Sequence, residues 1–384
     1  MSSSSIATGL DVFLQEHRNL VHRQRVGLVT NSTGVTRDLR PNVDALRDAD
    51  VNLVALFSPE HGLLGAAREG EQVASSMDAR TGLPVHSLYG NIRKPNRDML
   101  AGLDVLLFDL QDVGVRFYTY TATLALTLEA CAENHVPLIV LDRPNPINGI
   151  TIEGPVLDPK LQSFVGHGPL PMRYAMTLGE LGQFYNAELS MGAELRVIGL
   201  RGWRRAMWHD ETHLPWVLPS PNMPTLSAAT VYPGMCLIEG TNLSIGRGTT
   251  LPFEIVGAPW IDAHALGAAM NALKLAGVRF RPLSFVPSAN KFANENCFGV
   301  QVHVIDRDNF RPVLMTLHLI QTIRQMYSNK FGWNVAGFNR LIGDASAREK
   351  IDQGIAPASI VAAWTTGQIE FNRAREKYLL YGGA

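Results

Sequence analysis

Cysteine is scarce in this chain, and its charge is low and balanced. The 384 residues include three cysteines, Cys131, Cys236 and Cys297, an odd number at wide spacing. This set fits neither a disulfide framework nor a cysteine-ligated zinc site, so we expect a reducing compartment. Lys and Arg number 34 against 35 Asp and Glu, a formal net charge of −1. Proteins that bind nucleic acid usually carry an excess of Lys and Arg, which displaces counterions from the phosphates. This chain has no such excess, so nucleic acid is not an expected partner.

Long apolar runs and a targeting segment are also missing. No run of about 18 apolar residues occurs, which excludes a transmembrane helix and makes a membrane partner unexpected. The Ser-rich start, Met1 to Ala7, lacks the basic region and the apolar stretch of a secretory signal. We therefore expect a cytoplasmic protein. The alternative is an exported protein whose leader has been removed.

The chain has ample material for a folded core. Hydrophobic residues make up 46% of it and charged residues 18%, so intrinsic disorder is excluded. Its length predicts two or three domains. A chain of this size buries about three quarters of its unfolded surface.

The first 145 residues repeat one theme, in which a short apolar run is followed by a polar cluster and a helical stretch. The runs are nearly continuously apolar, as expected of strands buried on both faces of a parallel sheet. They are Arg25–Thr30, Val51–Phe57, Val105–Leu110 and Pro137–Leu141. Helical patterns lie between them, at Val43–Arg47 and Thr121–Glu133. This alternation predicts right-handed crossovers and a Rossmann-like, mostly parallel sheet.

Further helices and strands are predicted along the chain. Thr177 and Glu180 have the spacing of a capping box, which predicts a helix over Thr177–Ser190, and a strand is expected at Leu195–Leu200. The second half predicts helices over Asp262–Ala276 and Val313–Tyr327, then two or three short C-terminal helices. Gly299–Ile305 alternates apolar and polar residues, which is typical of a half-buried antiparallel strand.

A Pro-rich stretch from Pro215 to Pro233 separates these two patterns. We predict an α/β chain with a Rossmann-like catalytic domain over residues 6–222. A smaller α+β domain over residues 223–384 is expected to follow and to complete the cleft.

Each of the four apolar runs ends in a polar cluster. In open α/β sheets the ligand lies outside the carboxyl ends of the strands, so these clusters are the candidate site. The acids among them should project toward one edge, together with one histidine and two arginines. They are Glu60, Asp109, Asp112 and Asp142, with His61, Arg116 and Arg143. The alternative is structural, because Asp and Asn also cap helices and shape turns at such junctions.

The absence of two sequence motifs limits the classes of ligand that this site could bind. Neither GxGxxG nor GxxxxGK[ST] is present, so the phosphate cradles of dinucleotide and nucleoside-triphosphate enzymes are absent. An edge rich in carboxylates suits a neutral polyol such as a sugar. Paired carboxylates are what glycoside hydrolysis needs, one protonated acid for the leaving oxygen and a second group for nucleophilic, basic or electrostatic work.

Four aromatic residues near these clusters could stack on a pyranose ring or could belong to the core. They are Tyr89, Phe117, Tyr118 and Tyr120, and for Phe117 we expect a place in the core.

Two other segments carry weaker signals. His209 and His213 have the spacing of a helical metal site, but Pro215 follows almost at once, so we expect neither a metal nor a cofactor. The Gly-rich segment 240–249, preceded by Glu239, is either a loop with unusual backbone angles or a ligand-binding element. No G-x-S-x-G elbow occurs, which argues against a typical α/β-hydrolase.

Five motifs occur in a characteristic order and together resemble a known family. They are Ser58–Gly62 (SPEHG), Phe108–Tyr120 (FDLQDVGVRFYTY), Leu141–Pro146 (LDRPNP), Pro219–Pro224 (PSPNMP) and Glu239–Asn242 (EGTN). The chain resembles the bacterial exo-β-N-acetylmuramidases, a glycoside hydrolase family long described as a domain of unknown function. The resemblance spans residues 9–381. It implies removal of terminal N-acetylmuramic acid from the non-reducing end of peptidoglycan fragments.

The resemblance also implies roles for individual residues. Glu60 matches the glutamate proposed as catalytic in the family and is assigned as general acid. We predict as catalytic Glu60, Asp112 and Glu239. The predicted substrate-binding residues are Asn31, His61, Asp109, Arg116, Tyr118, Asp142, Arg143, Asn145, Asn222, Asn242 and Arg247. Arg116, Arg143 and Arg247 are candidates to bind the lactyl carboxylate of muramic acid.

The mechanism and some alternatives stay open at this point. Two carboxyl groups about 5 Å apart favour a retaining mechanism, and a separation of roughly 6.5–9.5 Å favours an inverting one. In a third mechanism the acetamide group of the substrate itself is the nucleophile.

The chain departs from the family at Tyr174, where a histidine is frequent, and at Ile245, where some members carry an acid. A non-catalytic muropeptide-binding module is therefore an alternative, and a nucleotide-dependent enzyme a third.

Overall fold

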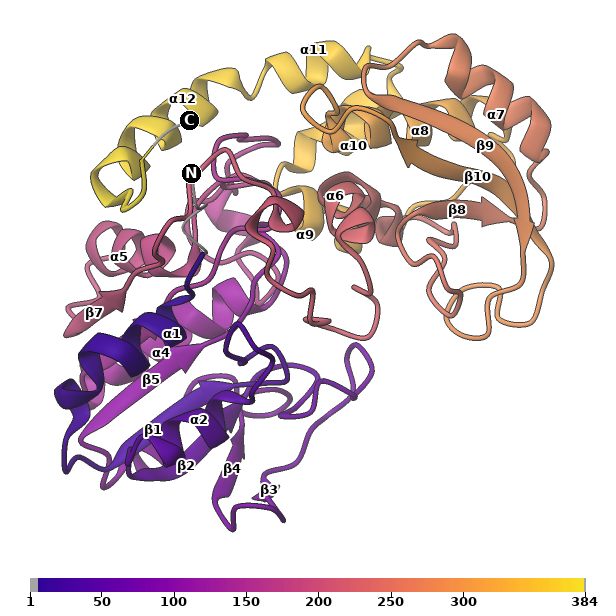
Figure 1. Cartoon of the computed structure of the whole chain (residues 1–384). Helices are drawn as coiled ribbons and strands as arrows, with labels where there is room; N and C mark the ends of the chain where they lie inside the picture. Colours follow the sequence, from indigo (N-terminus) through magenta and orange to yellow (C-terminus); the bar gives the residue numbers. More distant parts are fainter. Residues whose placement is uncertain (1–5, 383–384) are drawn as a thin grey trace, which may run out of the picture. The chain divides into compact units, whose positions relative to one another are not determined.

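The structure is a computed structural model that describes residues 6–382; the serines at positions 2–5 and the last two residues of the chain lie outside this range. The contacts divide the chain into two compact units (Figure 1). Among the described residues, the first unit comprises 6–151, 175–221 and 374–382, and the second 152–174 and 222–373. The predicted domain limits, 6–222 and 223–384, stay a prediction.

The first unit is built on a mostly parallel sheet, as predicted. Within residues 6–382 this sheet has seven strands in the order β3-β4-β2-β1-β5-β6-β7, and β3 is antiparallel to β4. The strands are β1 Val26–Thr30, β2 Leu53–Ser58, β3 Ser76–Met77, β4 Pro84–Ser87, β5 Val105–Asp109, β6 Leu138–Leu141 and β7 Leu195–Ile198. All five strands expected in this region are confirmed, with ends shifted by up to two residues. The sequence did not predict β3 and β4, which are too short to give a period.

The helices of the first unit are α1 Gly9–Val12, α2 Asn42–Asp48, α3 Arg97–Leu100, α4 Tyr120–Asn134 and α5 Leu178–Glu188. α1 precedes β1, and α2 and α4 confirm the two helices that the alternation predicts. The capping box is confirmed, because the Thr177 hydroxyl accepts from the Glu180 N–H and the Glu180 carboxylate accepts from the Thr177 N–H. This reciprocal pair satisfies two backbone donors and fixes where α5 begins.

The order of the strands in the sheet indicates where the candidate site lies. The chain proceeds from β1 outward to β2 and β4, then returns to the other side of β1 with β5 and continues to β6 and β7. The order therefore reverses between β1 and β5, so the connections after these two strands lead toward opposite edges of the sheet. Such a topological switch point leaves a crevice outside the carboxyl ends of the strands, where open α/β sheets bind their ligands.

The second unit combines helices with an antiparallel sheet. In its described part the sheet has three strands in the order β8-β10-β9, namely β8 Ile255–Ala258, β9 Val278–Phe285 and β10 Cys297–Val304. The predicted alternating strand is confirmed as β10. The helices are α6 Leu226–Met235, α7 Ala263–Ala272, α8 Pro312–Met326, α9 Val335–Ile342, α10 Ala345–Asp352, α11 Pro357–Ala362 and α12 Thr365–Arg375.

The expected number of C-terminal helices was wrong, since four follow α8 within the described range. Gly343, with φ of 78°, ends α9, and Pro357 opens α11. Glycine in the left-handed region and proline in the first turn both separate helices. Short 3-10 or π segments lie at Phe13–His17, Arg18–Val21, Pro159–Leu161, His209–Thr212, Cys236–Gly240 and Glu376–Tyr378.

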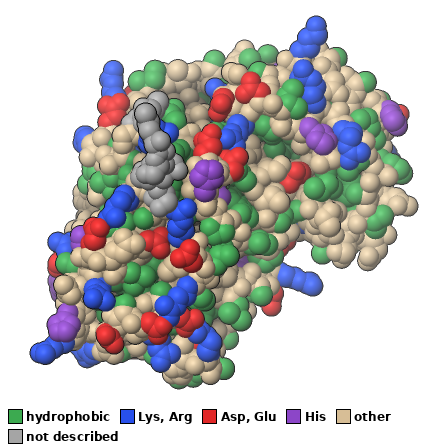
Figure 2. Space-filling model, in the orientation of Figure 1, with side chains coloured by type: hydrophobic (Ala, Val, Ile, Leu, Met, Phe, Trp, Pro, Cys, Tyr) green, Lys and Arg blue, Asp and Glu red, His purple; other side chains and the backbone are tan. Residues whose placement is uncertain are grey.

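The surface agrees with the balanced composition. Figure 2 shows Lys and Arg side chains interspersed with Asp and Glu on the visible face, as the net charge of −1 leads one to expect. Among residues 6–382, no helix combines the length and apolar character needed to span a bilayer.

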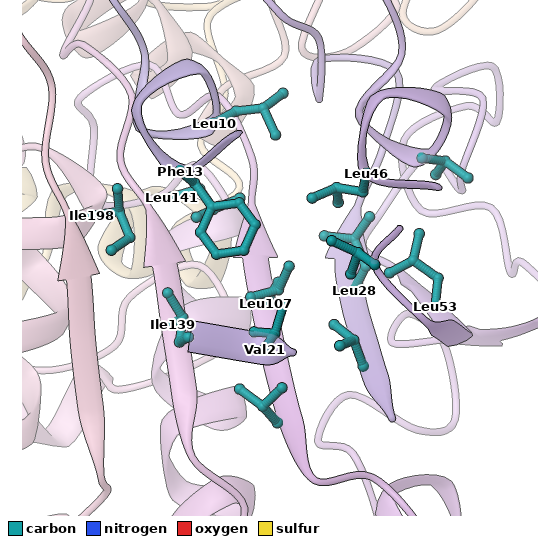
Figure 3. Close-up of a cluster of buried hydrophobic side chains, with 14 of the residues drawn as sticks. Leu10, Phe13, Val21, Leu28, Leu46, Leu53, Leu107, Ile139, Leu141 and Ile198 are labelled. Carbon is teal, nitrogen blue, oxygen red and sulfur yellow. The ribbon is translucent and has the colours of Figure 1, made fainter. Parts of the chain in front are cut away.

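One core cluster fills the space between the sheet of the first unit and the helices α1 and α2. Figure 3 shows the Phe13 ring beside Leu141 and above Ile139, with Leu46 near Leu28. Leu28 is completely buried. This packing holds the strands from which the site loops emerge.

We expect Leu28→Ala to lower the free energy of unfolding by about 2–5 kcal/mol, because it removes buried methyl groups and leaves a cavity. Urea denaturation measures this change. Leu64, which is 82% exposed, is the matched control, and Leu64→Ala should change stability by less than about 0.5 kcal/mol. Equal effects of the two substitutions would contradict the assigned core.

Candidate active site

The loops after β1 and β5 are joined at the switch point. The Asn31 Oδ1 accepts from the Thr33 N–H at 3.0 Å and from the Thr33 hydroxyl at 2.6 Å. The same hydroxyl accepts from the Gln111 N–H at 3.0 Å. All three residues are buried. The predicted convergence of strand ends is therefore present, and it is held by short polar contacts.

Glu60 lies two residues beyond β2, in a fixed position. Its side chain is 7% exposed, with Oε1 accepting from the Gly70 N–H at 3.2 Å and Oε2 from the Thr119 hydroxyl at 2.8 Å. Thr119 directly precedes α4, the helix that follows β5. His61 next to Glu60 has a left-handed φ of 73°. A non-glycine residue in this region is strained, and such strain is frequent at functional sites.

Tyr89 is a third group beside the Glu60 carboxylate. Burial, the Glu60 charge and a hydrogen bond to Glu60 together raise the pKa of Tyr89 to about 12. The phenol therefore stays protonated at neutral pH and is available as a donor.

Two buried tyrosines connect Glu60 with Asp112. The rings of Tyr118 and Tyr120 meet edge to face, with centroids 4.9 Å apart. Burial raises the pKa of both phenols, and the charges of Glu60 and Asp112 raise both further. The two carboxylates thus act on the same pair of phenols. Both carboxylates are therefore close enough for their charges to affect the phenols.

Tyr120 belongs to the core rather than to an exposed stacking surface. Its hydroxyl accepts from Asn31 Nδ2 at 2.6 Å and donates to the Pro219 carbonyl at 2.5 Å. This ties the first strand end to the PSPNMP motif. Phe117 is also buried, as expected, with 3% of its surface exposed.

Asp112 is held by a turn that requires glycine. Its Oδ2 accepts from the Gly114 N–H at 2.6 Å, and Gly114 has a φ of 78°. A Cβ on Gly114 would approach Asn145 Oδ1 to 2.4 Å. Asn145 in turn donates to the Met176 carbonyl at 2.9 Å and accepts from the Ile147 N–H at 3.1 Å. Asn145 therefore packs under the Asp112 turn.

Asp109 forms a buried ion pair with Arg143. Arg143 Nε donates to Oδ1 at 2.6 Å and its terminal nitrogen to Oδ2 at 3.0 Å, and Asn42 Nδ2 donates to Oδ2 at 2.7 Å. Asp109 is completely buried. Both of its oxygens are thus occupied by protein donors.

Asp142 is likewise surrounded by donors. One oxygen accepts from the Arg143 N–H at 3.0 Å and the Gly179 N–H at 2.8 Å, and the other accepts from the Thr177 hydroxyl at 2.7 Å and from the Tyr381 hydroxyl. Burial, the largest cause, raises the pKa of Asp142 to about 7. Asp142 therefore links β6, α5 and the C-terminal segment of the first unit.

Arg116 and His61 also lie inside the protein. Arg116 is completely buried, and this burial lowers its pKa to about 9, while Tyr185 opposes the shift. His61 is 8% exposed and its Nδ1 lies 2.8 Å from the Ala67 carbonyl.

A pocket of mixed character opens beside these strand ends in the first unit. Arg143, Gln111 and Thr33 contribute polar groups to it. Its other lining residues are Thr8, Val35, Thr36, Arg37, His209, Leu214, Pro215, Trp216 and Val217. Burial lowers the pKa of His209, whose ring meets Trp216 edge to face at 5.0 Å. Among the described residues, no three His, Cys, Asp or Glu side chains form a group that could hold a metal.

The predicted residues of the second unit form their own group. Arg247 Nε donates to Glu239 Oε1 at 2.5 Å, and the guanidinium lies 5.0 Å from the centre of the Phe253 ring. Asn242 donates to the Lys330 carbonyl at 2.8 Å and accepts from the Gly332 N–H at 2.9 Å. Asn222 is half-buried.

The two departures from the family pattern are buried in this unit. Tyr174 is completely buried and Ile245 is 4% exposed. Both side chains therefore pack inside the protein.

Several site residues were not predicted from the sequence. Thr119 lies within the longest motif but was not singled out as a partner of Glu60. Asn42, Thr33 and Gln111 gave no chemical signal, because amide and hydroxyl groups are common in loops. Only their contacts across the sheet edge reveal them.

Comparisons with known proteins show the family to which this chain is similar. The family profile described as Exo-beta-N-acetylmuramidase NamZ, N-terminal, matches residues 26–227, and its C-terminal counterpart matches residues 230–381. The chain is 46% identical over 378 residues to the peptidoglycan beta-N-acetylmuramidase NamZ of Bacillus subtilis (strain 168), covering 98% of this chain and 91% of that protein. These matches confirm the resemblance that the motifs predicted.

Two crystal structures of DUF1343 family proteins from Bacteroides fragilis NCTC 9343 have the same fold. One aligns with a TM-score of 0.91 at 36% identity, covering 98% of this chain and 99% of that chain. The other aligns with a TM-score of 0.79 at 30% identity, covering 99% and 100%.

Asp142 gives a prediction about pH. Because its pKa is raised from 3.8 to about 7 on folding, the folded state binds more protons between these values, and the free energy of unfolding should fall as pH rises from about 4 to 7. Asp142→Asn should remove this part of the slope in urea denaturation across that range. Asp38→Asn, at an exposed position, is the control. An Asp142→Asn protein with the wild-type slope would contradict the assignment.

Proposed function

Because the chain belongs to the exo-beta-N-acetylmuramidase NamZ family, we propose that it removes terminal, non-reducing N-acetylmuramic acid from peptidoglycan fragments, with Glu60 as its general acid. The chain is a glycoside hydrolase. The observation that carries the role of Glu60 is its fixed, buried carboxyl group at the carboxyl edge of the sheet. Cleavage of a glycosidic bond needs such a group to protonate the leaving oxygen.

The surroundings of Glu60 support this role. Thr119 and the Gly70 N–H hold the two carboxyl oxygens, so the side chain does not have to be oriented when substrate binds. Tyr89 remains protonated beside it, because its pKa is raised to about 12. A fixed acid with neutral donors around it suits an uncharged pyranose better than a phosphate.

Asp112 is proposed as the second carboxylate of the first unit. Its Oδ2 is held by the Gly114 N–H at 2.6 Å, and its charge, like that of Glu60, raises the pKa of Tyr118 and Tyr120. We assign to Asp112 electrostatic or positioning work in the reaction. Glu239, paired with Arg247, is proposed as a further carboxylate in the second unit. The anomer first released distinguishes an inverting mechanism, in which a carboxylate activates water, from a retaining one, in which a carboxylate or the substrate acetamide is the nucleophile.

The remaining substrate-binding residues stay predictions. Those of the first unit are Asn31, His61, Asp109, Arg116, Tyr118, Asp142, Arg143 and Asn145, and those of the second are Asn222, Asn242 and Arg247. We further propose that the enzyme acts in the cytoplasm, on wall fragments during recycling. Support comes from Cys131, Cys236 and Cys297, which are buried and form no disulfide within the described residues.

Glu60→Gln should lower kcat on a chromogenic β-N-acetylmuraminide by about 10²–10⁴-fold, since an amide cannot deliver the proton. Initial rates of colour release measure this, with circular dichroism to verify the fold. Glu194→Gln, at an exposed position of the same unit, should retain wild-type kcat. Wild-type turnover in Glu60→Gln would remove Glu60 from the role. No colour from the wild-type protein would instead favour a non-catalytic muropeptide-binding module.

Asp112→Asn should lower kcat by at least about 10²-fold with little change in KM, because the interaction lost is one made in the transition state. Steady-state kinetics with the same substrate test this, and Asp98→Asn, at an exposed position, is the matched control. A raised KM at unchanged kcat would show that Asp112 only binds substrate.

A further inference from the structure

A lysine that no sequence motif singled out joins the Glu239–Arg247 pair. Lys291 Nζ donates to the Thr241 carbonyl at 2.6 Å and to the Glu239 carbonyl at 3.1 Å. Its ammonium group therefore lies against the backbone of the EGTN motif. Lys291 and Arg247 are both half-buried, so each charge keeps some access to solvent.

The loop that carries Lys291 is strained and fixed to the Gly-rich segment. Asn290, Phe292 and Asn294 have φ values of 69°, 60° and 66°. The Ser288 N–H and hydroxyl both donate to the Gly248 carbonyl, at 2.9 and 2.8 Å. Asparagine adopts this region readily, but for Phe292 it costs about 1–3 kcal/mol and persists because the surroundings determine it.

Gly248 permits the close approach of these two segments. It has a φ of 79°, and a Cβ at this position would lie 2.4 Å from the Ala289 nitrogen. The segments that carry Arg247 and Lys291 are thereby brought together by backbone contacts.

The charges of this group do not cancel. Glu239 contributes one negative charge, and Arg247 and Lys291 contribute two positive charges. Tyr232 and Cys236 are close enough to be affected by Glu239 and Arg247, and burial raises the pKa of both well above its usual value, so they stay neutral. The cluster Glu239–Arg247–Lys291 thus carries a net charge of +1.

The ammonium group has donor capacity left. It carries three N–H bonds, and the contacts of Lys291 among the described residues account for two of them. A half-buried cation with a remaining donor, beside a guanidinium, fits a carboxylate, which accepts charge-assisted hydrogen bonds from both.

We propose that Lys291, together with Arg247, binds the lactyl carboxylate of N-acetylmuramic acid. This inference rests on the proposed function, since that substrate supplies the single negative charge that complements the cluster. Lys291 has two tasks in this arrangement. It holds the backbone of Glu239 and Thr241 in place, and it directs a donor to the lactyl group. The cluster then distinguishes muramic acid from N-acetylglucosamine, which has no lactyl ether.

The test compares two chromogenic substrates, a β-N-acetylmuraminide and the same compound with its lactyl carboxyl group converted to an amide. For Lys291→Met we expect kcat/KM to fall about tenfold more on the carboxylate substrate than on the amide, mainly through KM, because the lost backbone contacts affect both substrates and the lost charge affects only one. Lys291→Arg keeps the positive charge and should therefore recover most of the preference for the carboxylate substrate over the amide. Lys160→Met, at an exposed position of the same unit, is the matched control.

Equal losses of Lys291→Met on both substrates, or unchanged discrimination, would overturn the inference and leave Lys291 a structural residue. Thermal unfolding of each variant shows whether a loss on both substrates reflects a damaged fold. A wild-type protein that cleaves neither substrate would instead refute the proposed function.

Discussion

The buried contact among Asp109, Arg143 and Asn42 is the constraint on which the carboxyl edge of the sheet depends. Asn42 donates to Asp109 and also to the Thr30 hydroxyl, each at 2.7 Å, while Arg143 binds both oxygens of Asp109. One small network therefore ties together the ends of β1, β5 and β6. Removal of one partner from a buried ion pair leaves an uncompensated charge, at a cost of about 3–5 kcal/mol. The loops that carry the site emerge from strands that this network holds in register.

The strand-end acids divide into two groups according to their surroundings. Asp109 and Asp142 are surrounded by donors of the protein itself, and Asp142 thereby connects β6 and α5 to Tyr381 in the C-terminal segment. Glu60 and Asp112 instead act through their charges on the buried phenols of Tyr118 and Tyr120. A carboxylate that joins a strand end to a neighbouring helix or strand end stabilises the fold. One that is held at a fixed position beside neutral phenols is suited to chemistry.

Local signals predicted much of this molecule. Continuous apolar runs located β1, β2, β5 and β6, because strands covered on both faces have no polar side. The Thr177 and Glu180 spacing located the start of α5, since a capping box requires contacts only within one turn. The two-residue β3 and the four-residue β4 were missed, because segments so short carry no periodicity. The count of C-terminal helices failed for a related reason, as their limits depend on single residues such as Gly343 and Pro357.

By itself the sequence determined the parallel sheet, the convergence of acids and amides at its carboxyl edge, and the family to which the chain belongs. These properties follow from the order of residues along each strand and from motifs that are contiguous in the chain. Only the tertiary structure decided that Thr119 holds Glu60, that Asp109 is paired with Arg143, and that Lys291 lies against the EGTN backbone. Each of these contacts joins residues between 34 and 59 positions apart. No local pattern encodes such distances, because they arise when strands and loops pack together.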